Sequence, residues 1–167
     1  MLQRVLKMVT SWPVDVVAVV IGAYEEEVLE AVDFGDSLLV LNPEWKDGMA
    51  SSIRAGLDAL SADTSIERAF LALGDQPRIP DDIPTTLLEA MDRSERPVAL
   101  ARYRYTTSNP ALVDRSLWPR LMSRAGDRGA SQLFEAHPAW VEEVQVDYPP
   151  PRDVDTEDDA LDLLSTP

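Results

Sequence analysis

An apolar segment, Arg68–Leu73, runs directly into the turn residues Gly74–Pro77, among them Asp75. A short apolar run bounded by turn residues predicts a buried parallel strand, and ligands of open α/β sheets bind beyond the carboxyl ends of such strands. We therefore expect Asp75 at a ligand-binding edge, where a carboxylate can hold a divalent cation and, through it, the phosphates of a nucleotide. A turn-forming aspartate is the competing interpretation, and this pattern alone favours neither.

Strand and helix patterns alternate along the chain. Strands are predicted at 14–21, 37–41, 68–73, 97–101, 110–113 and 140–146, and helices at 2–9, 25–32, 49–60, 84–91, 116–124, 129–136 and 160–164. Such alternation predicts an α/β fold with a mostly parallel sheet covered on both faces, with mixed strand pairing after Tyr103. A single domain over residues 1–167 is expected.

The composition favours a small-molecule function. Thirty acidic residues against fifteen basic ones give a formal charge of −15, which repels nucleic acid and anionic membranes. The only lysines are Lys7 and Lys46, so a bound polyphosphate needs arginines, a metal ion or backbone N–H groups. No apolar segment is long enough to span a bilayer, and the first residues lack a signal-peptide pattern, so a cytoplasmic protein is expected.

A second candidate segment, Asn42–Arg54, follows a predicted strand and opens a helix. Gly48 permits a close backbone approach, and Ser51, Ser52 and the free N–H groups of the helix start are suited to a phosphate or a base edge. A plain helix start with adjacent serines is the stronger interpretation of the pattern by itself.

The third candidate segment is the acidic run that begins at Asp153 and follows the stiff connector Tyr148–Pro151. Acids at a helix N-terminus commonly cap the helix, and Asp153-Val154-Asp155 also has the DxD spelling of sugar-nucleotide transferases. A carboxylate of this acidic run could instead join Asp75 on one Mg²⁺, because carboxylates from separate segments often share a nucleotide-bound metal.

These segments together resemble the MobA-like nucleotidyltransferases, and most of all the molybdenum cofactor cytidylyltransferases. The resemblance rests on Asn42–Trp45, Gly48–Leu57 and Gly74–Pro77, followed in the same order by Ser108–Val113, Gly126–Ala130 and Asp153–Asp158. It covers essentially the whole chain.

The resemblance implies a Rossmann-like, three-layer α/β/α nucleotidyltransferase fold of the GT-A-like type. It implies Mg²⁺-dependent transfer of CMP or GMP from CTP or GTP to a phosphorylated molybdopterin, with a homo-oligomer or a molybdoenzyme as a further partner. The implied catalytic residues are Asp75 and Arg54, and the implied metal ligands are Asp75, Asp155 and Asp153. The implied nucleotide- or substrate-binding residues are Asn42, Gly48, Ser51, Ser52, Gln76, Pro77 and Asn109.

The family pattern begins with a strand and a glycine-rich loop, and Met1–Leu6 resembles the helix that follows that loop. We therefore expect a domain that is incomplete at its N-terminal side, with its first strand missing. Two alternatives remain open at this point: an accessory or degenerate member that binds the acceptor or a partner without catalysis, and a sugar-nucleotide transferase suggested by the DxD spelling alone.

Overall fold

The structure is a computed structural model and describes residues 1–154. Its strands are β1 (Ala18–Ile21), β2 (Leu38–Leu41), β3 (Arg68–Leu71), β4 (Val98–Tyr103), β5 (Thr106–Asp114) and β6 (Val141–Gln145). Its α-helices are α1 (Leu2–Val9), α2 (Glu25–Ala31), α3 (Met49–Ser61), α4 (Ile83–Ser94), α5 (Trp118–Met122) and α6 (Ser131–Ala136). Short 3-10 helices occur at η1 (Trp45–Asp47), η2 (Arg115–Leu117) and η3 (Pro138–Trp140).

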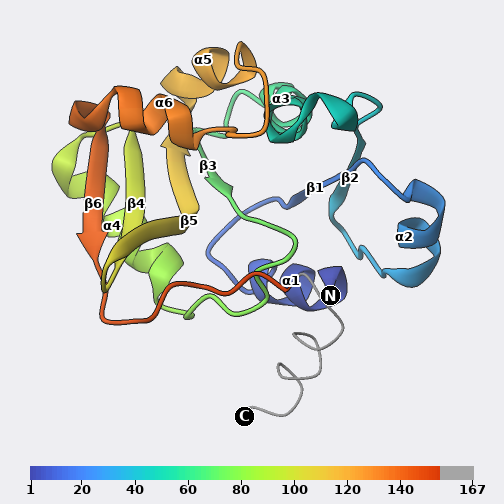
Figure 1. Cartoon of the computed structure of the whole chain (residues 1–167), viewed down its shortest axis with the longest axis horizontal. Coiled ribbons are helices and arrows are strands. Elements are labelled where there is room, and N and C mark those ends of the chain that lie inside the picture. The colour runs from blue at the N-terminus through green and yellow to red at the C-terminus, as the bar shows by residue number, and fades with distance from the viewer. Residues whose placement is uncertain (155–167) are drawn as a thin grey trace.

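The strands form two sheets that lie side by side (Figure 1). β1 and β2 pair in parallel, and the four-stranded sheet has the order β3-β5-β4-β6. Within it β4 and β6 are parallel, whereas β5 runs antiparallel to both β3 and β4. The α/β fold class is thus confirmed, with parallel and antiparallel pairs in equal number among the described strands.

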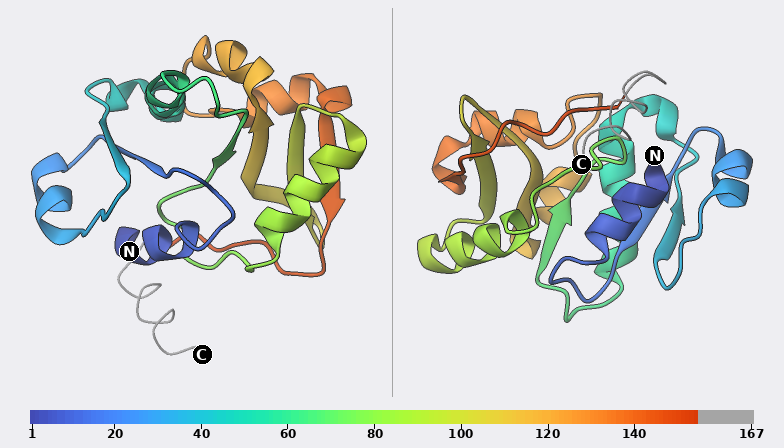
Figure 2. Two further views of the ribbon diagram at one scale, coloured as in Figure 1. Left: turned by 180° about the vertical axis from the view of Figure 1, so that it is seen from behind. Right: turned by 90° about the horizontal axis from the view of Figure 1, so that it is seen from below.

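Helices cover both faces of the four-stranded sheet. Leu57 of α3, Trp118 of α5 and Phe134 of α6 pack against one face, and α4 packs against the other through Leu87 and Met91. The view from below in Figure 2 shows α4 and α6 on opposite sides of this sheet. Burial of these large apolar side chains supplies the main driving force for the layered arrangement.

The two-stranded sheet is covered by α1 and α3. Leu6 of α1 is buried with Val19 and Ile21 of β1. On the other face, Gly56 of α3 lies so close to Val20 that an added Cβ would come within 3.1 Å of its side chain. The glycine therefore allows α3 to approach β1 closely.

Several predicted boundaries differ from the structure. The strand predicted from residue 14 begins at Ala18, because the preceding residues turn tightly and the Val14 N–H donates to the Trp12 carbonyl at 2.8 Å. The helix predicted at 116–124 is divided into η2 and α5. The helix predicted at 160–164 lies outside the described residues.

The strand predicted at 110–113 extends over Thr106–Asp114, because β4 and β5 form a hairpin in which Tyr103 pairs with Thr106. The turn residues are Arg104 and Tyr105. Neither is the Gly, Asn or Asp that usually signals a tight hairpin turn, so the mixed pairing predicted after Tyr103 could not be assigned to a hairpin at this position. None of the helices in residues 1–154 is both long and apolar enough to cross a membrane.

Candidate functional site

The loop after β3 and the C-terminal segment lie next to each other. The Val154 N–H donates to the Asp75 carbonyl at 3.0 Å, and the Gln76 Nε2 group donates to the Asp153 Oδ1 atom at 2.7 Å. Asp75 is half-buried, and its Oδ1 atom is shielded from solvent. The structure therefore brings together two acidic segments that are far apart in sequence, as the interpretation of a shared site requires.

Gln76 is the buried centre of this junction. It is only 4% exposed, and its Oε1 atom has no hydrogen-bond partner among the described residues. A buried amide oxygen without a partner is costly, so such an atom commonly points to a water, an ion or a ligand group at the site. Gln76 and Asp153 together offer oxygen atoms of the type that hard divalent cations prefer.

Asp155, the other predicted metal ligand, lies outside the described residues. Within residues 1–154 no group of three or more acidic or histidine side chains is arranged to hold a metal ion. Mg²⁺ bound to a nucleotide needs only one or two carboxylates, since phosphate and water oxygens complete its octahedral shell. Asp75 and Asp153 are two carboxylates, which is the number and type of protein ligand that nucleotide-bound Mg²⁺ needs.

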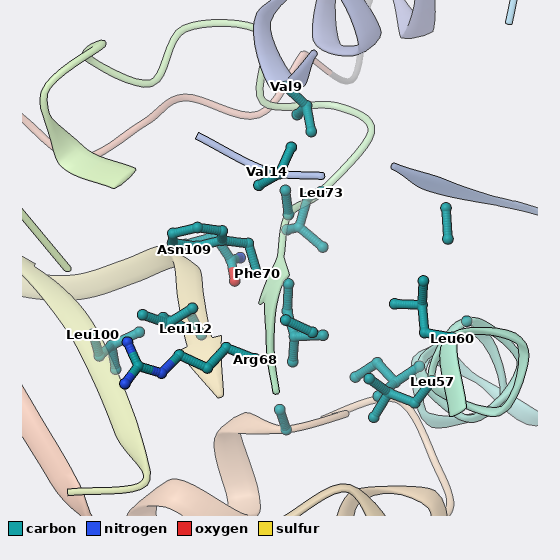
Figure 3. A pocket seen from close by; sticks show the side chains of 18 of the residues that line it. Val9, Val14, Leu57, Leu60, Arg68, Phe70, Leu73, Leu100, Asn109 and Leu112 are labelled. Carbon is teal, nitrogen blue, oxygen red and sulfur yellow. The ribbon is translucent and has the colours of Figure 1, made fainter. Parts of the chain in front are cut away.

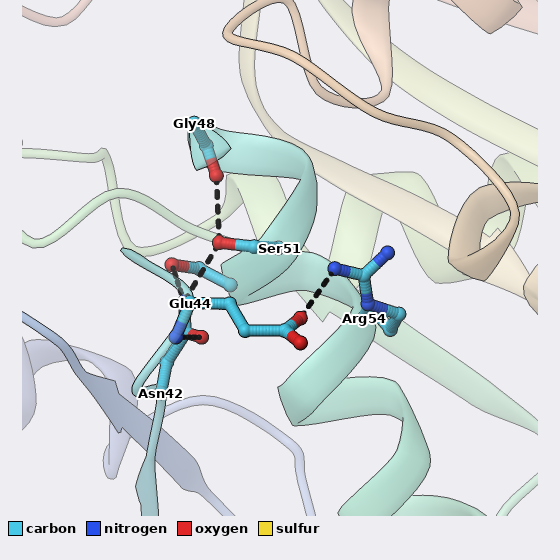
Figure 4. A network of polar contacts seen from close by, with 6 residues as sticks. Asn42, Glu44, Gly48, Ser51 and Arg54 are labelled. Carbon is cyan, nitrogen blue, oxygen red and sulfur yellow. Dashed lines mark hydrogen bonds and ion pairs between the residues drawn. The ribbon is translucent and has the colours of Figure 1, made fainter. Parts of the chain in front are cut away.

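The second predicted segment forms a closed polar network at the start of α3 (Figure 4). Asn42, 4% exposed at the end of β2, donates from Nδ2 to the hydroxyl groups of Ser51 at 2.8 Å and Ser52 at 3.0 Å. Its Oδ1 atom accepts from the Glu44 N–H at 3.0 Å, and the Ser51 hydroxyl donates to the Gly48 carbonyl at 2.8 Å. Both N–H groups of the Asn42 amide are thus used within the protein.

This network fixes the path of the chain between β2 and α3. Arg54, one of the predicted catalytic residues, lies on the same helix and forms an ion pair with Glu44 at 2.8 Å (Figure 4). Both of these side chains are substantially exposed, so the pair adds little stability and leaves the guanidinium group accessible to a ligand.

Asn42→Ala is expected to lower the free energy of unfolding by about 2 kcal/mol, because it leaves two serine hydroxyls and one backbone N–H without their partner. Chemical denaturation measures the change. Gln3→Ala is the matched control: Gln3 makes two hydrogen bonds to the backbone of Asp33 but is exposed, and its loss is expected to cost less than about 0.5 kcal/mol. Equal losses in the two variants would contradict a stabilising role for the Asn42 network.

Gly48 gives the turn before α3 its geometry. Its φ of 92° lies in the region that favours glycine, and a Cβ on it would clash with Asp127 Oδ1 and approach the Gly126 carbonyl carbon within 2.7 Å. The loop Gly126–Arg128 is held there by a hydrogen bond from the Ala50 N–H to the Gly126 carbonyl at 3.1 Å. The predicted Gly48 and Gly126–Ala130 segments therefore meet in space.

A cavity of about 1670 Å³ lies between β1 and β3 (Figure 3). Its lining reaches Gly74, the residue before Asp75, and it includes Asn109 of β5. The backbone carbonyl of Asn109 accepts a hydrogen bond from the buried Tyr103 hydroxyl at 3.0 Å. Burial raises the pKa of Tyr103 to about 12, with a further contribution from the Asp82 carboxylate, so this hydroxyl keeps its proton at neutral pH.

Pro77, the last predicted binding residue of the β3 loop, lines a second cavity of about 640 Å³ together with Arg4, Lys7 and Arg78. The cavity lining thus holds three cations and one acid, Asp81, a net positive group in a chain of charge −15. Sequence reasoning missed this group, because Arg4 and Lys7 come from α1 and Arg78 from a loop far along the chain. The three-residue spacing of Arg4 and Lys7 on one helix was the only local signal.

One curated protein is similar to most of the chain. The chain is 28% identical over 159 residues to the nicotine blue oxidoreductase of Paenarthrobacter nicotinovorans, a match that covers 89% of this chain and 74% of that protein.

Among solved structures, the homologue of Mycobacterium tuberculosis Rv0371c from Mycobacterium sp. strain JC1 is similar with a TM-score of 0.83 and 29% identity, covering 98% of this chain and 81% of that one. Rv0371c of Mycobacterium tuberculosis H37Rv, in a complex with manganese, is similar with a TM-score of 0.81 and 25% identity, covering 99% of this chain and 85% of that one.

A protein-family model also matches most of the chain. Residues 1–141 match the MobA-like NTP transferase domain, a span that includes β3, Asp75 beyond it and the polar network around Asn42. Together with the α/β architecture, this match shows that the chain belongs to the MobA-like NTP transferase family.

Proposed function

We propose that this member of the nucleotidyltransferase family transfers CMP or GMP from CTP or GTP to a phosphorylated molybdopterin in molybdenum cofactor maturation. The observation that carries the proposal is the junction of Asp75, Gln76 and Asp153, which assembles carboxylate and amide oxygens from two distant segments. The order of the sequence motifs supports molybdopterin as the acceptor. The cytoplasm, where nucleoside triphosphates are available, is the proposed location, with a homo-oligomer or a molybdoenzyme as a further partner.

A divalent cation, Mg²⁺, is the proposed cofactor. Asp75 and Asp153 would hold the ion, because hard cations prefer carboxylate oxygens as ligands. The manganese complex of Rv0371c supports the use of a divalent metal by a related protein. When bound, the ion supplies charge neutralisation to the phosphates around the reacting phosphorus.

The residues of the chain itself would orient the reactants. Arg54 is proposed to attract the phosphates with its accessible guanidinium group, after exchange of its partner Glu44. Gly48 would let the backbone approach the nucleotide, while Asn42, Ser51 and Ser52 hold the Gly48 turn in place through their hydrogen bonds. Pro77 and Asn109 line the two cavities next to the Asp75 loop and would contribute to the walls of the binding region.

Oxidoreduction is a second candidate function, and the observation that favours it is the 28% identity to a protein named nicotine blue oxidoreductase. Such a reaction needs an electron donor or acceptor, for which a nicotinamide dinucleotide is the chemical class to test. Its pyrophosphate is an anion, so the cations Arg4, Lys7 and Arg78 around the second cavity are the groups to examine for its binding.

The test is calorimetric titration with CTP, GTP and NADPH, each with and without Mg²⁺ or Mn²⁺, followed by an assay of pyrophosphate release with molybdopterin. We expect CTP or GTP to bind only with the metal present. Asp153→Asn is expected to weaken this binding at least about tenfold, because it removes a charge that faces the cation.

Asp147→Asn is the matched control, since Asp147 lies on the same connecting segment but is 96% exposed and pairs with Arg104. Its nucleotide affinity is expected to equal that of the wild type. Metal-independent binding of CTP and GTP, or metal-dependent binding that Asp153→Asn leaves unchanged, would contradict the proposed site. Tight binding of NADPH alone would favour the redox alternative.

A further inference from the structure

Residues 146–154, which we call the strap, leave β6 and run back across the molecule toward α1 (Figure 1). The strap begins in the core, since Val146 is buried and its N–H donates to a carbonyl of β4 at 3.0 Å. It ends at the loop after β3, where the Val154 N–H donates to the Asp75 carbonyl at 3.0 Å. β6 and β3 are the two edge strands of the four-stranded sheet, so the strap carries Asp153 from one side of that sheet to the other.

The strap lies along the loop that joins β3 to α4. Near its start, the Tyr148 hydroxyl donates to the Oδ2 atom of Asp82, directly before α4, at 3.2 Å. Near its end, Asp153 accepts from Gln76, which lies close to β3 in the same loop, at 2.7 Å. Successive contacts therefore advance along the strap and go back along the loop, so the two segments run antiparallel in one register.

Three consecutive prolines, Pro149–Pro151, separate the two ends of the strap. Proline has no N–H group and a fixed φ, so this part favours a stiff, extended chain with a rise of about 3.1 Å per residue. The loop beside it contains Pro77 and Pro80, which also lack an N–H group. A ladder of backbone hydrogen bonds is therefore disfavoured here. The contacts at the two ends of the strap, and the length of the prolines between them, decide where Asp153 lies along the loop.

The register matters because a metal ligand tolerates little displacement. A shift of one residue in an extended chain moves a side chain by about 3 Å. Mg²⁺ binds its oxygen ligands at about 2.1 Å in near-ideal octahedral geometry, so a carboxylate displaced that far would not reach an ion held by Asp75. The hydrogen bond between Gln76 and Asp153 would be lost by the same shift.

We propose that Tyr148 and the three prolines position Asp153: the hydroxyl fixes the strap on Asp82, and the stiff segment then places the Asp153 carboxylate beside the Asp75 loop. Tyr148 is thus a positioning residue, which acts through Asp153 on the cation. This action on the cation rests on the function proposed above, whereas the register of the strap on the loop does not.

The first test changes the length of the strap and keeps its ends. Deletion of Pro150 shortens the strap by about 3 Å. We expect amide hydrogen exchange at Val154 to become at least about tenfold faster, because its bond to the Asp75 carbonyl is lost. The affinity for CTP or GTP with Mn²⁺ is expected to fall at least about fivefold. Pro150→Ala keeps the length and is the matched control, expected to stay within about twofold of the wild type in both measurements.

The second test removes the contact at the start of the strap. Tyr148→Phe deletes only the hydroxyl group and is expected to speed exchange at Val154 about threefold, because the strap is then held less firmly. Asp82→Asn keeps an oxygen that accepts from Tyr148, and its exchange is expected to equal that of the wild type. Tyr105→Phe is the control for loss of a tyrosine hydroxyl, since Tyr105 is 74% exposed in the hairpin turn.

Hydrogen exchange is measured without metal or nucleotide, so it reports on the register alone. Exchange at Val146 is expected to stay unchanged in every variant, because its N–H bond to β4 precedes the altered residues. Unchanged exchange at Val154 after deletion of Pro150, the same exchange in Pro150→Ala as in the deletion, or equal acceleration at Val146 and Val154 would overturn the proposal. Faster exchange at Val154 in a protein whose wild type binds no nucleotide with Mn²⁺ would support the register and contradict the proposed function.

Discussion

Asp75→Asn is expected to reduce metal-dependent nucleotidyl transfer about a thousandfold, because loss of one metal-holding charge removes several kcal/mol of stabilisation from the reacting phosphate groups. Asparagine has nearly the same shape as aspartate, and the Asp75 backbone carbonyl still accepts from the Val154 N–H. The fold is therefore expected to persist. Rates of pyrophosphate release and titration with Mn²⁺ and CTP or GTP measure the effect.

Asp81→Asn is the matched control for this variant. Asp81 follows in the same loop region, is exposed, and lines the second cavity with Arg78. It is expected to retain transfer within about twofold, since an exposed carboxylate away from the metal contributes little. Should Asp75→Asn keep its metal-dependent turnover while its melting curve matches the wild type, the assignment of Asp75 to the metal site fails.

Gly48→Ala is expected to have the largest effect on stability, with a loss of about 3 kcal/mol in the free energy of unfolding. One part comes from placing alanine at a φ of 92°. The other comes from crowding, since the new Cβ would meet the Gly126 carbonyl carbon at 2.7 Å and the Asp127 nitrogen at 2.8 Å. Backbone atoms at that distance cannot move away as the end of a long side chain can.

The variant Gly126→Ala separates the contribution of the backbone conformation from that of crowding. Gly126 has almost the same φ, 93°, but an added Cβ would have no neighbour within 4 Å. This control is expected to lose only the conformational part, about 1 kcal/mol. Chemical denaturation of both variants gives the crowding contribution as their difference. If both lose the same free energy, the close packing between the α3 start and the Gly126–Arg128 loop does not contribute to stability.

The sequence was most informative where local patterns decide the structure. The apolar run before Gly74 became β3 with Asp75 beyond it, although β3 pairs antiparallel with β5 and not in parallel as predicted. The helix after Gly48 became α3 nearly as predicted. Apolar periodicity and turn residues act over a few residues, so both features can be recognised from neighbouring positions. The family motif also predicted that the Asp153 segment would approach the Asp75 loop, as the Gln76–Asp153 hydrogen bond shows.

Other features depend on partners that are distant in the sequence. The hairpin of β4 and β5 was missed because Arg104 and Tyr105 carry no turn signal, and the pairing is decided by burial of both strands. Gly48 must be glycine because a Cβ there would clash with Asp127. No local sequence pattern predicts this contact. The number of sheets was missed as well, since β1 and β3 do not meet within residues 1–154.

The separation of β1 and β2 from the other strands bears on how cooperatively this chain unfolds. No backbone pairing within residues 1–154 connects the two sheets, so their coupling depends on side chains of α1 and α3 that contact both. Packing contacts transmit less cooperativity than a continuous ladder of hydrogen bonds between strands. We therefore expect the part of the molecule around β1 and β2 to open separately from, and more readily than, the four-stranded sheet with its two covered faces.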